Sequence, residues 1–168
     1  MPTHASRRDF LRADLTRTIV LRPPGALTVA FERACTGCGE CASACPEAII
    51  HTDHRGSVML DLSRGACTFC GECARACPTD ALDVGRIGDW PWVATVGETC
   101  LSINNVACRS CEDACEARAI RFRLEVGGKA RPNIDATECT GCGACIAICP
   151  VGAVSLARTA QSEPELRP

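Results

Sequence analysis

The chain has 168 residues, about the size of one ordinary domain, yet it contains only 4 Phe, 2 Trp and no Tyr. It also contains 16 cysteines, so we expect small aliphatic side chains packed around whatever the cysteines bind, in place of a large aromatic core. The formal net charge of −2 argues against nucleic acid as a partner, because an acidic body repels phosphate.

Residues 1–26 are predicted to form a basic N-terminal arm. Residues 6–12 resemble the twin-arginine export motif, but Asp14, Arg17 and Arg22 interrupt the apolar segment that such a signal requires. No apolar run approaches the roughly 20 residues of a membrane helix. We therefore expect a cytoplasmic protein, with the arm serving as a docking segment or as a neutralising partner for the acidic body.

Three cysteine runs share the spacing C-x2-C-x2-C-x3-C-P, which is the bacterial ferredoxin signature for [4Fe-4S] clusters. The glycines around these cysteines suit tight loops whose amides approach the cluster sulfurs. The proline after each fourth cysteine fixes the turn there. The three runs are Cys35, Cys38, Cys41 and Cys45; Cys67, Cys70, Cys73 and Cys77; and Cys139, Cys142, Cys145 and Cys149.

A further run, third in chain order, departs from this spacing. Seven residues separate Cys100 from Cys108, Cys111 and Cys115 follow, and Glu116 replaces the proline. A cubane with an inserted loop is the interpretation we favour, because it gives every cysteine a place. A labile cluster and a vacant site with free thiols are the alternatives, so we expect four clusters, or three if this site is vacant.

Two other interpretations of the cysteines are weaker. Disulfides are common in short cysteine-rich secreted chains, but residues so close in a tight loop rarely reach disulfide geometry with one another. Structural zinc usually takes two separated C-x2-C pairs, not three thiols within seven residues followed by a fourth. The pattern therefore indicates iron–sulfur chemistry.

Two predicted hairpins group the runs into modules. Residues 49–52 and 58–62 flank one turn, and apolar residues alternate with charged ones over 120–126 before Gly127 and Gly128. We expect strand 27–31 to pair with 82–84, and strand 92–96 with 154–156. The predicted fold is α+β, with two tandem bacterial-type 2[4Fe-4S] ferredoxin modules. The organisation is an arm (1–26), module 1 (27–84), a linker (85–91), module 2 (92–160) and a polar tail (161–168).

In two-cluster ferredoxins the fourth cysteine of each run ligates the partner cluster. Applied here, this rule predicts four sets of iron ligands, which we name clusters A to D. Local ligation, in which the fourth cysteine serves its own run, is the alternative. The sets are Cys35, Cys38, Cys41 and Cys77 for A; Cys67, Cys70, Cys73 and Cys45 for B; Cys108, Cys111, Cys149 and Cys100 for C; and Cys139, Cys142, Cys145 and Cys115 for D.

Other residues give weaker indications. Trp90 and Trp92 could anchor a partner or pack between the modules. The sequence shows no general acid–base pair and no nucleophile arrangement, so we expect no enzyme activity.

The arm motif at residues 6–11, the three regular runs and the irregular run at 98–116 together resemble the NapF family, the ferredoxin-type proteins of periplasmic nitrate reductase systems. The resemblance implies a cytoplasmic protein that binds the precursor of the molybdenum-containing catalytic subunit before its export. It implies maturation of that subunit, by cluster assembly or by electron supply. The alternative is a general electron-transfer ferredoxin, or a ferredoxin-like subunit of a dehydrogenase or hydrogenase complex.

Overall fold

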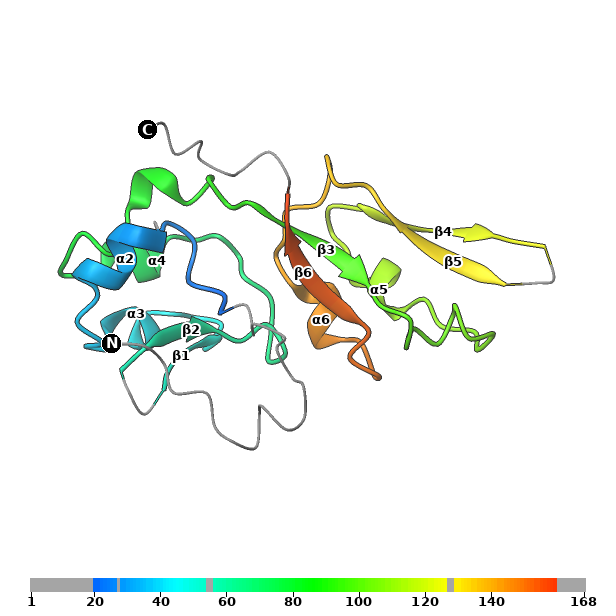
Figure 1. The fold of residues 1–168 in the computed structure, drawn as a ribbon, viewed down its shortest axis with the longest axis horizontal. Helices are drawn as coiled ribbons and strands as arrows, with labels where there is room; N and C mark the ends of the chain where they lie inside the picture. Colours follow the sequence, from blue (N-terminus) through cyan, green and yellow to red (C-terminus); the bar gives the residue numbers. More distant parts are fainter. Residues whose placement is uncertain (1–19, 27, 54–55, 127–128, 160–168) are drawn as a thin grey trace, which may run out of the picture.

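A computed structural model describes residues 20–26, 28–53, 56–126 and 129–159. Short helices and two-stranded antiparallel sheets form two lobes that follow one another along the long axis of the molecule, as Figure 1 shows. The fold is therefore α+β with two tandem modules, as the sequence predicts. The Arg7–Arg8 motif and the tail lie outside the described residues. Within the described residues, no helix has the length and apolar character needed to cross a membrane.

The first lobe contains the hairpin predicted between the first two cysteine runs. Strand β1 (Ile50–Thr52) pairs with β2 (Val58–Leu60), with Ile50 opposite Leu60. Ile49 and Val58 are both 1% exposed, so the hairpin covers the lobe's core. Among the described residues three helices complete this lobe, and Figure 1 labels them: α2 (Thr28–Ala34), α3 (Glu40–Ser43) and α4 (Glu72–Arg75).

The predicted pairing of strand 27–31 with strand 82–84 is wrong. Residues 28–34 form helix α2, Val84 begins a 3-10 turn, and within the described residues an isolated bridge between Ala26 and Leu82 joins the two ends of this module. The pairing of first and last strands in two-cluster ferredoxins predicts a strand here, but the residues at 30–34 favour a helix. Helix α2 leads directly into the first run, because the Cys35 amide donates to the Phe31 carbonyl at 2.9 Å.

The second lobe contains both predicted strand pairs. Strand β3 (Trp92–Val96) pairs with β6 (Val154–Arg158), and β4 (Ile120–Leu124) pairs with β5 (Ala130–Ile134). Both predictions are confirmed, although the turn at Gly127 and Gly128 lies outside the described residues. Two short helices complete the lobe: α5 (Ser110–Asp113) and α6 (Ala144–Ala147).

The two lobes contact each other through the loops of the second and fourth cysteine runs. The Cys67 amide donates to the Cys142 carbonyl at 2.8 Å. The Trp90 indole donates to the Gly141 carbonyl at 3.1 Å and lies edge-on to Phe69, with ring centroids 6.1 Å apart. Trp90 therefore packs between the lobes, after the 3-10 turn η1 (Val84–Arg86). These hydrogen bonds and the aromatic contact join the loop of the second run to the loop of the fourth run.

The end of the basic arm lies on the first lobe. Arg22 stacks over the Phe31 ring at 4.9 Å and donates hydrogen bonds to the Ser57 hydroxyl and the Val58 carbonyl. The Leu21 carbonyl accepts a hydrogen bond of 2.8 Å from the Leu60 amide. Arg22 is thus occupied by contacts within its own module.

Candidate iron–sulfur sites

Sixteen thiols line four cavities, and each cavity has four of them. In every case three thiols come from one run and the remaining thiol comes from elsewhere. All sixteen cysteines are free thiols. The four cavities are lined by Cys35, Cys38, Cys41 and Cys77; by Cys45, Cys67, Cys70 and Cys73; by Cys100, Cys108, Cys111 and Cys149; and by Cys115, Cys139, Cys142 and Cys145.

These four groups are the same sets that the crossover rule predicts for clusters A, B, C and D. The fourth cysteine of each regular run faces the cavity of its partner run, and Cys100 completes the irregular site. A zinc ion needs all its donors around one point, whereas a cubane takes one thiolate at each of four irons. Thiols spread around a cavity fit the cubane. Within the described residues, no group of three His, Cys, Asp or Glu side chains could hold a single metal ion.

The irregular site is as roomy as the regular ones. Its cavity encloses about 20 Å³, the same as each of the other three. The five residues inserted relative to the regular spacing therefore leave a cavity of the same size as the others. Apolar side chains such as Phe122 and Val154 line the rest of this cavity.

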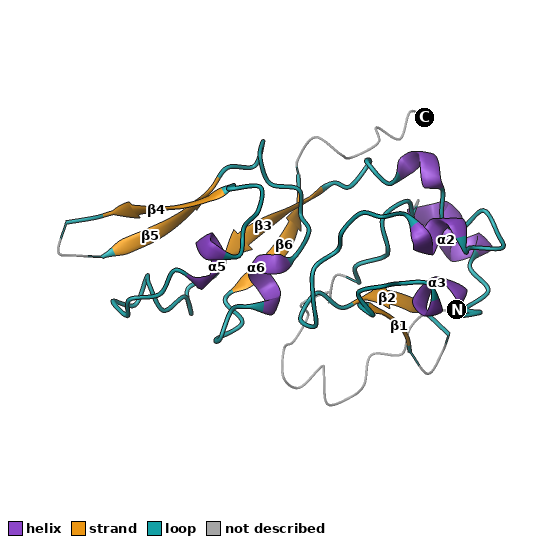
Figure 2. Ribbon diagram, turned by 180° about the vertical axis from the view of Figure 1, so that it is seen from behind, coloured by secondary structure: helices purple, strands orange, loops and turns teal. Residues whose placement is uncertain are grey.

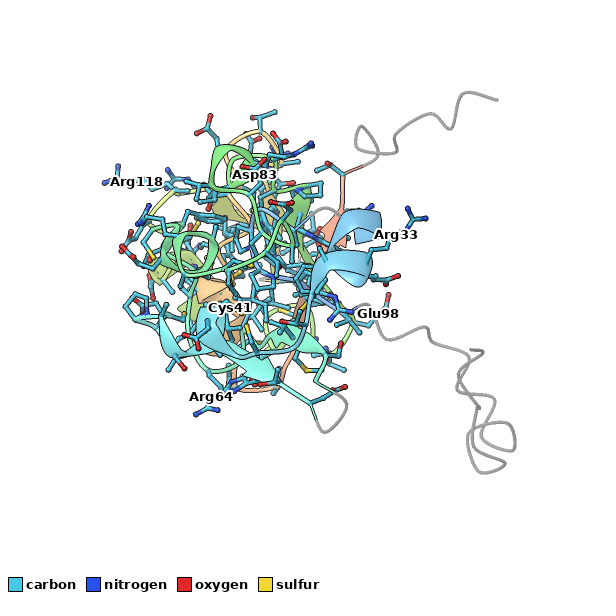
Figure 3. The ribbon with its side chains drawn as sticks, turned by 90° about the vertical axis from the view of Figure 1, so that its left-hand side faces the viewer. Arg33, Cys41, Arg64, Asp83, Glu98 and Arg118 are labelled. Carbon is cyan, nitrogen blue, oxygen red and sulfur yellow. The ribbon has the colours of Figure 1, made fainter. Side chains whose placement is uncertain are left out.

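Each run delivers its third cysteine from a one-turn helix. Cys41, Cys73, Cys111 and Cys145 occupy α3, α4, α5 and α6, and Figure 3 shows Cys41 inside the body of the molecule. The chain leaves the helix just before the fourth cysteine, so the next thiol faces a different cavity. Helices α3, α4 and α6 follow a glycine, whereas α5 follows Arg109.

Burial acts most strongly on these third cysteines. Burial first, and then the neighbouring thiols, raise the pKa of Cys41, Cys73 and Cys111 to about 11 and that of Cys145 to about 12. Iron binds the thiolate, not the thiol. A buried thiol of this kind loses its proton only when a positive charge replaces it, so metal binding and deprotonation are coupled here.

Other sulfurs accept hydrogen bonds from the backbone. The amide of Ala153 donates to the Cys149 sulfur at 3.2 Å, and the amide of Ala94 donates to the Cys139 sulfur at 3.4 Å. Burial raises the pKa of Cys77, but hydrogen bonds from the Thr79 hydroxyl and nearby amides outweigh it, so the net pKa is lowered. Hydrogen bonds of this type adjust the reduction potential of a cluster.

Two polar side chains organise the inserted loop of the third run, and sequence analysis missed both. Ser102 is only 4% exposed and donates to the Ala130 carbonyl on β5. The Asn104 amide donates to the Glu98 carbonyl at 2.7 Å and to the Cys100 carbonyl at 2.9 Å. Together they hold Cys100 against the cavity. A Ser and an Asn within an insertion are weak signals, because such residues are common in any loop.

Replacing Ser102 and Asn104 with alanine should release Cys100 from the third cavity. Each change removes hydrogen bonds worth on the order of 1 kcal/mol, and Ser102→Ala leaves a buried carbonyl without its partner. Iron should fall from about 16 to about 12 per chain. The control is Ser155→Ala, which removes an exposed hydroxyl contact to Thr95 and should leave iron unchanged. Equal iron in all three proteins would show that these residues do not position Cys100.

Phe69 adopts a backbone conformation that favours glycine. Its φ is +54°, and the equivalent positions of the first and fourth runs are Gly37 and Gly141. A bulky residue at positive φ costs roughly 1–2 kcal/mol. Its contact with Trp90 offsets that cost, and Phe69 also lines the cavity of cluster B.

Comparison with known proteins accounts for these cavities. A model of the 4Fe-4S dicluster domain matches residues 27–82, and a second such model matches residues 106–153. The "Ferredoxin-type protein NapF" of Haemophilus influenzae is 36% identical, over 94% of this chain and 96% of its own length. The NapF protein of Escherichia coli K12 is 35% identical, over 92% of this chain and 96% of its own length.

The chain belongs to the NapF family of ferredoxin-type proteins. It therefore carries multiple [4Fe-4S] clusters and has an iron–sulfur electron-transfer role. A "Methylamine utilization ferredoxin-type protein MauM" of Methylophilus methylotrophus is 34% identical, over 75% of this chain and 64% of its own length. Proteins whose names refer to different systems are thus similar to this chain.

Proposed function

We propose that this NapF-family chain supports the maturation of a periplasmic nitrate reductase, acting on the precursor of the molybdenum-containing catalytic subunit. Four clusters on one short chain suit either of two tasks. The chain would help to assemble that subunit's iron–sulfur site, or it would supply electrons to it. The observation that carries the redox part is the arrangement of all sixteen thiols in four complete sets, the irregular third run included. In this proposal the protein has no substrate chemistry of its own.

The proposal places this work in the cytoplasm. The twin-arginine-like motif is followed by charged residues, not by an apolar segment. A catalytic subunit that is exported in a folded, cofactor-loaded state must receive its clusters before export, so its helper must meet the precursor there. The redox donor that supplies this chain is left open by the proposal.

The second candidate is a general electron-transfer ferredoxin, or a ferredoxin-like subunit of a dehydrogenase or hydrogenase complex. The similarity to a ferredoxin-type protein named for methylamine utilisation favours it, since that name refers to a different system. The two candidates differ in what they bind: a maturation factor recognises the precursor itself, whereas a general carrier does not. The neighbouring genes discriminate as well, because a molybdenum reductase gene beside this one favours maturation.

Deleting the gene should lower nitrate reductase activity more than it lowers the amount of catalytic subunit. Replacing Cys38 or Cys142 with alanine should reproduce the deletion, because each removes one iron ligand from its set. The purified protein should also bind the purified precursor directly, and cell fractionation should recover it from the cytoplasm. Absence of binding at low salt, together with full reductase activity in the deletion strain, would favour the general carrier instead.

A further inference from the structure

The hairpin of β4 and β5 projects from the end of the molecule that holds the third cavity, and both ribbon views show it running out past α5 (Figures 1 and 2). It is strongly basic. Residues 118–134 contain five basic side chains and one acidic side chain, and all six are exposed. Because the whole chain has 18 basic and 20 acidic residues, the remainder has 13 and 19. The hairpin therefore opposes the charge of the body.

The arginines of this hairpin gather on one face. Side chains alternate along a strand, so Arg121 and Arg123 lie opposite the face that carries Phe122. Arg123 faces Arg131 directly across the ladder, and like charges in that position are destabilising. Glu125 pairs with Arg131 at 3.1 Å. Within the part of the chain that the structure describes, neither Arg121 nor Arg123 forms an ion pair.

Apolar side chains are exposed at the tip of the same hairpin. Leu124 is 80% exposed and Val126 fully exposed. These are the two most exposed large apolar side chains of the described residues, and burying them would be favourable. Leu124 lies on the Phe122 face of β4, opposite Arg121 and Arg123. A partner that contacts both the apolar tip and the arginines must therefore enclose the hairpin from both faces, as a groove does.

The hairpin is also firmly joined to the third cavity. Phe122 lines that cavity, and the Arg109 guanidinium lies 5.4 Å from the Phe122 ring centroid. Ser102, from the inserted loop, donates to the carbonyl of Ala130, which lies opposite Leu124. A partner bound at the tip would therefore lie next to the irregular site and would meet a surface braced by the inserted loop.

We propose that the β4–β5 hairpin is the docking surface of this chain, and that its occupant is an acidic groove on a partner protein. The groove would cover Leu124 and Val126 and pair with Arg121 and Arg123. This inference rests on the proposed function, in which the partner is the nitrate reductase precursor. It assigns docking to the module 2 end, not to the N-terminal arm.

The test compares binding of the purified precursor to wild-type protein and to Arg121→Glu plus Arg123→Glu, both loaded with clusters. The second substitution places a carboxylate opposite Arg131, an attractive cross-strand pair, so the hairpin should remain folded. The matched control is Arg33→Glu plus Arg64→Glu, which alters the net charge equally. Arg33 and Arg64 project from the module 1 end, as Figure 3 shows. The hairpin variant should bind at least about tenfold more weakly at low salt, and the control should bind like wild type.

A second variant, Leu124→Ser plus Val126→Ser, tests the apolar part. It should weaken binding at every salt concentration, because it removes no charge. Equal binding by wild type and both hairpin variants would overturn the docking surface and leave the proposed function standing. No binding by wild type would overturn both. Binding to anionic phospholipid vesicles that is lost in the arginine variant, with precursor binding unchanged, would assign the hairpin to membranes and also overturn the inference.

Discussion

Replacing Cys45 with alanine should remove the cluster held by the second cysteine run, not the one held by its own run. Cys45 lines the same cavity as Cys67, Cys70 and Cys73, whereas Cys77 completes the cavity of the first run. The variant should lose about four of about sixteen irons. Iron and acid-labile sulfide analysis of anaerobically purified protein measures this loss.

Double variants reveal which cluster is lost. Two ligands of one cluster act as a unit, so their losses should not add. Cys45→Ala plus Cys67→Ala should lose about four irons, as either change does alone, whereas Cys45→Ala plus Cys35→Ala should lose about eight. If Cys45 served its own run, the two double variants would exchange these results. Because the pairs lie in the same module, each controls for general damage to the other.

Gly141→Ala should be the most destabilising change outside the cysteines. An added Cβ would lie 2.2 Å from the Trp92 carbonyl oxygen and 2.7 Å from the Trp90 indole nitrogen, and the φ of +68° is itself unfavourable for alanine. The carbonyl belongs to β3 and cannot move without breaking the sheet. We expect a loss of about 4 kcal/mol or more in the free energy of unfolding, the upper range for one substitution.

The matched control for this change is Gly152→Ala. Gly152 also has a positive φ, +58°, but a Cβ there would meet nothing within 4 Å. Its cost should be near 1 kcal/mol, from backbone strain alone. Thermal unfolding of both cluster-loaded variants under anaerobic conditions gives the comparison. Similar unfolding temperatures for the two would contradict the contact between the lobes that Gly141 makes possible.

Cysteine spacing and strand alternation predicted the four cysteine runs and most of the fold. The spacing alone does not decide which cavity each fourth cysteine faces, because local and crossed ligation both use every cysteine; the four sets followed from the ligation rule of two-cluster ferredoxins. The hairpins followed from alternation, as with Ile120, Phe122 and Leu124, which a half-covered strand requires. The ligand role of the sixteen cysteines remains a prediction until clusters are measured, since grouping of thiols is not itself ligation.

Helix α2 was missed although its residues at 30–34 favour a helix, because the expected pairing of the first and last strands took precedence over local propensity. The other features that sequence missed depend on contacts between distant residues. Phe69 occupies a glycine-like position only because Trp90, from the linker, packs against it. Ser102 matters because of Ala130, 28 residues away. None of these pairings has a local pattern that sequence alone could reveal.

The most direct test of the four-cluster account is the content of iron, sulfide and zinc in wild-type protein purified without oxygen. Four complete sets of thiols predict about 16 irons and about 16 sulfides per chain, with absorption that bleaches on reduction. Iron near 12 per chain would contradict occupancy of the irregular site formed by Cys100, Cys108, Cys111 and Cys149. Stoichiometric zinc without sulfide would contradict the account as a whole.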